Sequence, residues 1–303
     1  VLMTAVPAKV AGVAEVVLCV PPGPEGRIDD VVLAAAAVAE VDEVYAVGGA
    51  QAIAALAYGT ESVPPVDVIV GPGNVYVAIA KREVAGTVGV PSAFAGPSEV
   101  VVVADATSPV ELVAIDICVQ AEHGPDGLAW LVCWDPAVAD AVDDAVARVV
   151  AEAPRAGDIT ATLAEGGYAV VVDGPDAAIE VANAIAPEHL QLMTDDPEAL
   201  LARVRHAGAV FCGPWSPASL GDYAAGPSHV LPTNGSARFA GALTVADFCK
   251  DVHVVTVEPS GFERLAGAVR TLAEAEGLDA HAASIRMRLD ALRAERTTEP
   301  STP

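Results

Sequence analysis

The chain has 303 residues, of which 53 % are hydrophobic, enough to bury a sizeable core and more typical of two domains than of one. Its 16 Lys and Arg stand against 41 Asp and Glu, and the resulting net charge of −25 repels nucleic-acid phosphates and anionic lipids. We therefore expect neither a nucleic acid nor a membrane surface among its partners.

The cysteine pattern and the opening segment both indicate a cytoplasmic protein. The cysteines are odd in number and include no Cys-x-x-Cys pair, and most lie in apolar runs, as reduced buried thiols do. They are Cys19, Cys118, Cys133, Cys212 and Cys249. Residues 1–20 are apolar, but Lys9 and Glu15 interrupt them and no cleavage pattern follows. We interpret this segment as domain interior and expect the natural sequence to begin upstream of Val1.

Short β-branched runs alternate along the chain with Ala-rich segments of helical spacing. The runs predict strands at 15–20, 43–47, 66–70, 99–104, 128–134, 168–172, 189–193 and 209–211. The intervening segments predict helices at 30–39, 50–58, 74–84, 109–121, 136–151, 175–184 and 197–205. Repeated strand, helix, strand connections require parallel pairing with helices on both faces of the sheet. The sequence therefore predicts a doubly wound α/β fold.

Two composition changes divide this pattern into domains. A Gly- and Pro-rich segment, 86–97, separates the first strand and helix units from the second set, and the alternation ends after Gly213. We expect a first Rossmann-like domain at residues 1–98 and a second at residues 99–243.

The C-terminal part has helical spacing without strands. Beyond Pro259, residues 261–276 and 280–294 predict two amphipathic helices with no sheet of their own to cover. We therefore expect a helical tail at 244–303 that packs on something else. Its polar end, 297–303, contains two prolines and predicts disorder.

Two glycine turns are candidate cofactor sites, because ligands of open α/β sheets bind beyond the carboxyl ends of the strands. They are residues 47–51 (VGGAQ) and 70–74 (VGPGN), and each follows a predicted strand and opens a predicted helix. Free amides at such helix starts bind the pyrophosphate of a dinucleotide. Neither turn has the spacing G-x-G-x-x-G, however, and glycine turns also arise for purely geometric reasons. Both interpretations stay open at this point.

Four scattered side chains form a candidate metal site. Gln120 and His123 are three residues apart near the end of a predicted helix, so they project from one face as two ligands of one ion would. Alternatively, His123 satisfies free carbonyls at the helix end. Asp222, in the Gly- and Ser-containing segment 221–229, and His281, between the tail helices, add a carboxylate and an imidazole. Two imidazoles and two oxygen donors suit zinc and leave positions for a substrate.

A carboxylate and an imidazole are neighbours at the head of a predicted strand, where Glu188 and His189 follow Ala186 and Pro187. Such a pair can serve as general base and general acid. It is equally consistent with a solvated strand end.

Six segments, in order along the chain, together resemble the histidinol dehydrogenase family. They are 48–60 (GGAQAIAALAYGT), 67–74 (DVIVGPGN), 95–100 (AGPSEV), 120–125 (QAEHGP), 185–190 (IAPEHL) and 221–233 (GDYAAGPSHVLPT). The resemblance runs from Val1 to about His281, and most of the family begins well upstream of this match. It implies two Rossmann-like domains with doubly wound parallel sheets, one of them incomplete here. It also implies the oxidation of L-histidinol to L-histidine through L-histidinaldehyde, the last step of histidine biosynthesis, with two NAD+ consumed and one zinc held per site.

The resemblance also assigns roles to individual residues. It implies that Glu188 and His189 are the acid/base pair and that Gln51 and Asn74 contact NAD. The implied zinc ligands are Gln120, His123, Asp222 and His281. The implied substrate contacts are Ser98, Glu276, His189 and the same zinc ligands. A homodimer is implied as well, in which the tail, with Glu276 and His281, completes the partner's site.

Three rival hypotheses remain. An aldehyde dehydrogenase-like enzyme would form a thiohemiacetal at Cys118 or Cys212, although apolar surroundings raise the pKa of a thiol and blunt it. A truncated, inactive homologue would keep zinc and the dimer surface without turnover. A zinc hydrolase would use the Glu-His pair to activate water, but it has no use for Gln51 and Asn74.

Overall fold

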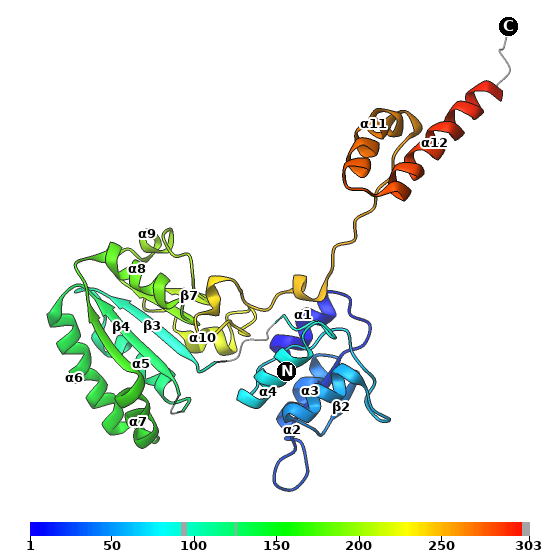
Figure 1. Cartoon of the computed structure of the whole chain (residues 1–303). Coiled ribbons are helices and arrows are strands. Elements are labelled where there is room, and N and C mark those ends of the chain that lie inside the picture. The colour runs from blue at the N-terminus through cyan, green and yellow to red at the C-terminus, as the bar shows by residue number, and fades with distance from the viewer. Residues whose placement is uncertain (92–95, 125, 299–303) are drawn as a thin grey trace. The chain divides into compact units, whose positions relative to one another are not determined.

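The computed structural model describes residues 1–91, 96–124 and 126–298. It separates into two compact units, Val1–Lys250 and Asp251–Pro303 (Figure 1). Part of the glycine- and proline-rich segment 86–97 lies outside the described residues. The three-part division at residues 98 and 243 stays a prediction.

The first unit opens with a small parallel sheet. Strand β1 (Val17–Cys19) pairs with β2 (Glu43–Tyr45), and Val17 lies opposite Glu43. The helices of this part are α1 (Leu2–Val10), α2 (Asp30–Val38), α3 (Gly49–Tyr58) and α4 (Val75–Val84). The strand expected at 66–70 is wrong, because only a single bridge, between Val68 and Gly89, forms there. Among the described residues no further extended segment lies alongside it to continue a ladder.

Local sequence accounts for these helices. Asp29 accepts a hydrogen bond from the Val31 amide and begins α2, and Asn74 accepts one from the Val77 amide at 3.1 Å and begins α4. Gly59, at φ +76°, ends α3. Apolar side chains of α3 and α4, such as Ile53 and Val84, pack into one buried cluster. Side chains thus cap the starts of α2 and α4, and α3 and α4 are buried on one face.

The second sheet has five parallel strands in the order β5-β4-β3-β6-β7 (Figure 1). The strands are β3 (Glu99–Ala104), β4 (Leu128–Cys133), β5 (Gly167–Val171), β6 (His189–Met193) and β7 (Ala209–Cys212). Val100 of the central strand lies between Ala129 on one side and His189 on the other. The strands expected at 99–104 and 189–193 coincide with β3 and β6.

Helices cover both faces of this sheet. Val100 and Val102 of β3 pack towards α5 and α6, whereas Val101 and Val103 pack towards α8 and α9. The covering helices are α5 (Val110–Ala121), α6 (Pro136–Glu152), α7 (Ala156–Gly166), α8 (Pro175–Ile185) and α9 (Pro197–Leu201). All four valines are at most 1 % exposed, as expected of a parallel strand buried on both faces. The predicted α/β class with parallel sheets is therefore confirmed.

Several helices differ from the expectation. α1 and α7 were not expected, and α9 ends at Leu201 rather than at Arg205. The segment 221–229 begins inside α10 (Ala218–Tyr223), for which no helix was expected. Gly221 packs closely within this helix, since a Cβ there would lie 2.9 Å from the His229 ring and from Phe211. Contacts with distant residues thus override the low helix propensity of this segment.

The second unit is a pair of helices, α11 (Pro259–Ala275) and α12 (Asp279–Thr298). Ala266, Ala273 and Ala282 are its buried residues, so small side chains allow the two helices to approach closely. The helical tail is confirmed. The disorder expected from residue 297 is wrong for residues 297 and 298, where the helix continues, and residues 299–303 lie outside the described part.

Among the described helices, none has the length and hydropathy needed to cross a membrane.

Candidate functional site

The candidate catalytic pair lies at the amino edge of the five-stranded sheet. His189 opens β6, and its register partner Val100 is the second residue of β3, so Glu188 and Glu99 come together just before them. The C-terminal end of α5, which carries Gln120, leads back to this same edge, where the Leu128 amide donates to the Ser98 carbonyl. This candidate pair therefore lies at the edge opposite to the carboxyl ends of the strands, in line with its predicted place at the head of a strand.

Glu188 is a buried carboxyl group. Its side chain is 8 % exposed, and its Oε2 accepts a hydrogen bond from the Glu99 amide at 3.1 Å. Burial raises the pKa of Glu188 to about 7, and the charges of Glu99 and Asp222 act in the same direction, while hydrogen bonds from Glu99 and Ser98 oppose them. The solvated strand end considered above is therefore excluded. At neutral pH this carboxyl is poised to exchange a proton.

His189 is a buried imidazole with a defined tautomer. Its Nδ1 lies 3.0 Å from the carbonyl oxygen of Glu99, and because a carbonyl only accepts, Nδ1 carries the proton. The other ring nitrogen, Nε2, is then the basic one. Burial lowers the pKa of His189 to about 4, with the neighbouring His229 as a further cause, so the ring is neutral at pH 7.

His229 connects this pair with the candidate metal ligand Asp222. Its Nε2 lies 2.7 Å from His189 Nε2 and 3.1 Å from Asp222 Oδ1, and the two imidazole rings stack with centroids 4.8 Å apart. The segment that contains His229 is anchored by Ser228, whose hydroxyl donates to the Met3 carbonyl. Reasoning from sequence singled out this segment but not His229. The only available signal was its place in the motif GDYAAGPSHVLPT.

Three of the candidate zinc ligands belong to the first unit. Gln120 is 4 % exposed, and its Nε2 has no hydrogen-bond partner among the described residues. His123 is exposed, and its Nδ1 lies 3.1 Å from the Val119 carbonyl, so the helix-end contact weighed above is present and Nε2 stays available. Asp222 is half-buried beside His229. An amide oxygen, an imidazole nitrogen and a carboxylate are ligand types that fit zinc.

The remaining candidates lie in the second unit. His281 is exposed in the first turn of α12, and Glu276 is exposed at the end of α11. Within the described residues, no group of three or more His, Cys, Asp or Glu side chains converges as a metal site. His229 connects Asp222 with the catalytic pair. The set of four zinc ligands stays a prediction.

The two glycine turns border one cavity of about 800 Å³ in the first unit. Gly48, Gly49 and Gly73 line it together with Asn74. A Cβ at Gly48 would lie 2.7 Å from Pro21, and Gly49 has φ +75°, so both positions also require glycine for local geometry. The cavity is large enough for part of a dinucleotide.

Three further side chains surround this region. Gln51 is exposed in the first turn of α3, and the Asn74 side chain caps α4. Lys81, which sequence reasoning missed, lines the cavity, and its ammonium donates to the Gly71 carbonyl. Burial lowers the pKa of Lys81 to about 8.

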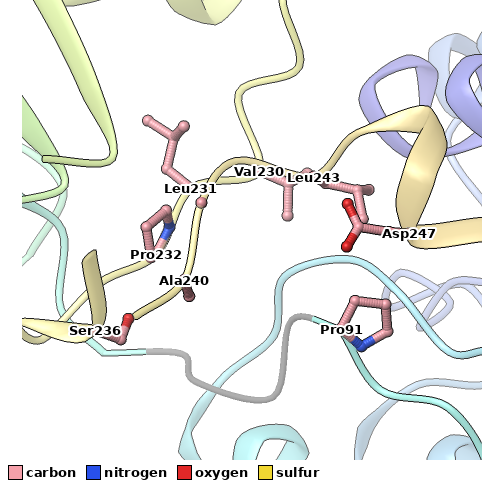
Figure 2. A pocket seen from close by; sticks show the side chains of 9 residues that line it. Pro91, Val230, Leu231, Pro232, Ser236, Ala240, Leu243 and Asp247 are labelled. Atoms are coloured by element: carbon pink, nitrogen blue, oxygen red, sulfur yellow. The ribbon is translucent and has the colours of Figure 1, made fainter. Parts of the chain in front are cut away.

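A second, much smaller pocket of about 30 Å³ lies beside the chain that follows His229 (Figure 2). Its lining includes Pro91, Val230, Pro232 and Asp247. That volume accommodates about one water molecule, so it is not a substrate site.

Comparisons with known proteins agree on one family. The family model described as histidinol dehydrogenase matches residues 1–289. The chain is 50 % identical over 292 residues to the histidinol dehydrogenase of a Synechococcus strain, covering 96 % of this chain and 67 % of that protein. It is 51 % identical over 288 residues to that of Moorella thermoacetica, covering 95 % and 68 %.

A solved structure is similar as well. The crystal structure of histidinol dehydrogenase from Elizabethkingia anophelis matches with a TM-score of 0.91 at 36 % identity, over 96 % of this chain and 67 % of that one. The chain therefore spans about two thirds of the length of these relatives. Together these matches show that the chain belongs to the histidinol dehydrogenase family of oxidoreductases.

Proposed function

We propose that this chain carries out the NAD- and zinc-dependent oxidation of L-histidinol to L-histidine through L-histidinaldehyde. The observation that carries the proposal is the buried pair Glu188 and His189, in which one group is a neutral base and the other a carboxyl with a pKa of about 7. Each of two successive oxidations at one carbon needs a proton acceptor, and this pair offers two.

His189 is the base of the first oxidation. With Nδ1–H bound to the Glu99 carbonyl, Nε2 would accept the proton of the substrate hydroxyl, and bound NAD+ would supply the hydride acceptor. The ring of His229, whose Nε2 lies 2.7 Å from His189 Nε2, holds the imidazole in this orientation. Burial keeps His189 unprotonated at neutral pH.

Glu188 serves the second oxidation. An aldehyde must take up water before it can release a second hydride, and a carboxylate removes a proton from that water. Because the pKa of Glu188 is about 7, an appreciable share of the group is ionised at neutral pH. Ser98 hydrogen-bonds Glu188 and is proposed to contact the substrate at the same place.

Zinc, held by Gln120, His123, Asp222 and His281, would position the imidazole and amine of the substrate. The half-buried carboxylate of Asp222, beside His229 in the first unit, supports this assignment. Glu276, close in sequence to His281, is proposed to hold the substrate amine. In NAD binding, the proposed roles of Gln51 and Asn74 are side-chain contacts at the starts of α3 and α4.

The assembly we propose is a cytoplasmic homodimer in which the tail of one copy completes the site of its partner. The second unit exposes many apolar side chains for its size, which a second copy would cover. They include Val252, Val254, Val255, Leu265, Val269 and Leu272. All five cysteines are free, as expected of a cytoplasmic protein.

Separate titrations of zinc and NAD+, followed by turnover with L-histidinol, test the proposal. We expect one zinc per chain and two NADH per histidinol consumed. His189→Asn should lose turnover, whereas the exposed His253→Asn serves as a matched control that keeps it. Zinc uptake without NAD+ binding would instead identify an inactive zinc-binding homologue.

A further inference from the structure

We propose that Glu99 is a positioning residue, which fixes both candidate catalytic side chains with its main chain and ties them to the turn at 233–235 with its carboxyl group. The inference rests on the proposed function and deepens it. It concerns a residue to which neither the family resemblance nor the sequence patterns assign a role.

The main chain of Glu99 contacts both catalytic candidates. Its N–H donates to Glu188 Oε2 at 3.1 Å, and its carbonyl oxygen accepts from His189 Nδ1 at 3.0 Å. Because both contacts come from one residue at the start of β3, they fix the spacing of the two side chains. They also select the His189 tautomer whose Nε2 is basic.

The carboxyl group of Glu99 holds the turn. It is 3 % exposed and accepts hydrogen bonds from the amides of Asn234 and Gly235, which lie at φ +55° and +70°. Successive backbone amides in such a turn form an anion-binding concavity. The turn is also fastened by Thr233, whose hydroxyl oxygen accepts from the Gly96 amide at 2.6 Å. The chain that carries His229 is thus tied to the strand that orients His189.

The same carboxyl group acts on Glu188 through its charge. The groups that face Glu188 are the carboxyls of Glu99 and Asp222, the Ser98 hydroxyl and His189, whose Nδ1 lies 3.6 Å from Oε2. Glu99 and Asp222 both raise the pKa of Glu188. The second oxygen of Glu99, Oε2, is buried and has no hydrogen-bond partner in the described part of the chain. Burial raises the pKa of Glu99 itself, while hydrogen bonds from the Glu188, Asn234 and Gly235 amides lower it and favour the charged form.

Glu99→Gln removes the negative charge of the side chain but keeps its hydrogen bonds to the turn, because the amide oxygen of Gln still accepts from the turn amides. Infrared difference spectra across pH, with Glu188→Gln identifying the Glu188 carboxyl band, measure the midpoint at which Glu188 ionises. We expect this midpoint to fall by about 0.5 to 1 pH unit in Glu99→Gln, as removal of a like charge requires. The pH profile of aldehyde oxidation should shift the same way. The exposed Glu152→Gln is the matched control and should shift neither.

Glu99→Ala removes both the negative charge and the hydrogen-bond acceptor of the side chain. Amide hydrogen exchange at 234 and 235 should become about ten-fold faster, the loss expected for one hydrogen bond to a charged group. Exchange in Glu99→Gln should stay near that of the unmodified chain. If Glu99→Ala does not fold, the near-isosteric Glu99→Gln still carries the test.

An unchanged Glu188 midpoint in Glu99→Gln would overturn the electrostatic role, and unchanged exchange in a folded Glu99→Ala would overturn the anchoring role. The infrared and exchange measurements need no zinc, NAD+ or substrate. A chain that fails to oxidise histidinol yet shows both effects would contradict the proposed function alone. A chain that oxidises histidinol and shows neither effect would contradict this inference alone.

Discussion

The Nε2 atoms of His189 and His229 lie 2.7 Å apart, so a single proton occupies the space between two imidazoles. His189 already commits its own proton, on Nδ1, to the Glu99 carbonyl. The proton between the rings therefore belongs to His229, and His189 Nε2 accepts it. In the absence of substrate, the nitrogen that we propose as the base is thus already engaged as an acceptor.

This arrangement predicts different effects for loss of the proposed base, His189, and for loss of a proposed zinc ligand, His123. His189→Asn should suppress the first hydride transfer and retain zinc, whereas His123→Ala should lose zinc first. Zinc content by mass spectrometry and single-turnover NADH formation measure the two effects. Equal zinc loss in both variants would make His189 a ligand and refute the assigned roles.

Removal of the Glu188 carboxyl should affect the second oxidation. Glu188→Gln should keep alcohol oxidation and slow aldehyde oxidation by about 100- to 10,000-fold, the usual contribution of a general base. The unmodified chain needs ionised Glu188, so aldehyde oxidation should rise as pH increases through about 7, and the variant should lose this rise. Rates measured with L-histidinol and with L-histidinaldehyde from pH 5.5 to 8.5, about the range in which Glu188 ionises, check both points. The reverse pattern would reassign water activation to another residue.

The rival cysteine mechanism requires a reactive thiolate, which burial of the two candidate thiols disfavours. Burial raises the pKa of Cys118 to about 11, and burial together with the charge of Glu198 raises the pKa of Cys212. At pH 7 about one Cys118 in ten thousand is then a thiolate. Cys118→Ala and Cys212→Ala should both keep the two oxidations. Loss of aldehyde oxidation in either variant, with NADH formation from histidinol intact, would establish the rival mechanism.

The sequence predicted the central elements of the fold because their pattern is local. The run Val100–Val103 is β-branched throughout, and only a strand buried on both faces accommodates it, which is why β3 was predicted without error. Helix α7 has no such signal, since its N-cap is Arg155 with no capping hydrogen bond and its sequence holds Thr and Gly. The segment 66–70 has the sequence pattern of a strand, but it forms only a single isolated bridge in the structure.

The candidate site likewise includes residues that the sequence identified and residues that it missed. Glu188 and His189 are adjacent in the sequence, so their pairing was visible there. The contact between His189 and His229 spans 40 residues, and that between Glu99 and Glu188 spans 89. Contacts of this range arise from strand register and loop return, which no local spacing encodes. His229 and Glu99 were therefore missed as individual residues.

The stability of the site should depend on the strand that carries it. Leu192, in the middle of β6, is fully buried between β3 and the helices α8 and α9, so Leu192→Ala should lower the free energy of unfolding by about 2–5 kcal/mol. Leu201→Ala, at an exposed position of α9, should cost much less. Urea unfolding followed by circular dichroism compares the two. Equal losses would mean that the packing around β6 is wrong.

Because the candidate pair opens β6, the far ends of the same strands are separated from it by roughly 15 Å of sheet. The turn after β5 lies at that far rim, and a Cβ at Gly174 would meet no other described atom within 4 Å. A dye, an affinity handle or a tether to a solid support placed at this turn would leave the chemistry undisturbed. The inverted position of the site thus provides a natural attachment point for labelling.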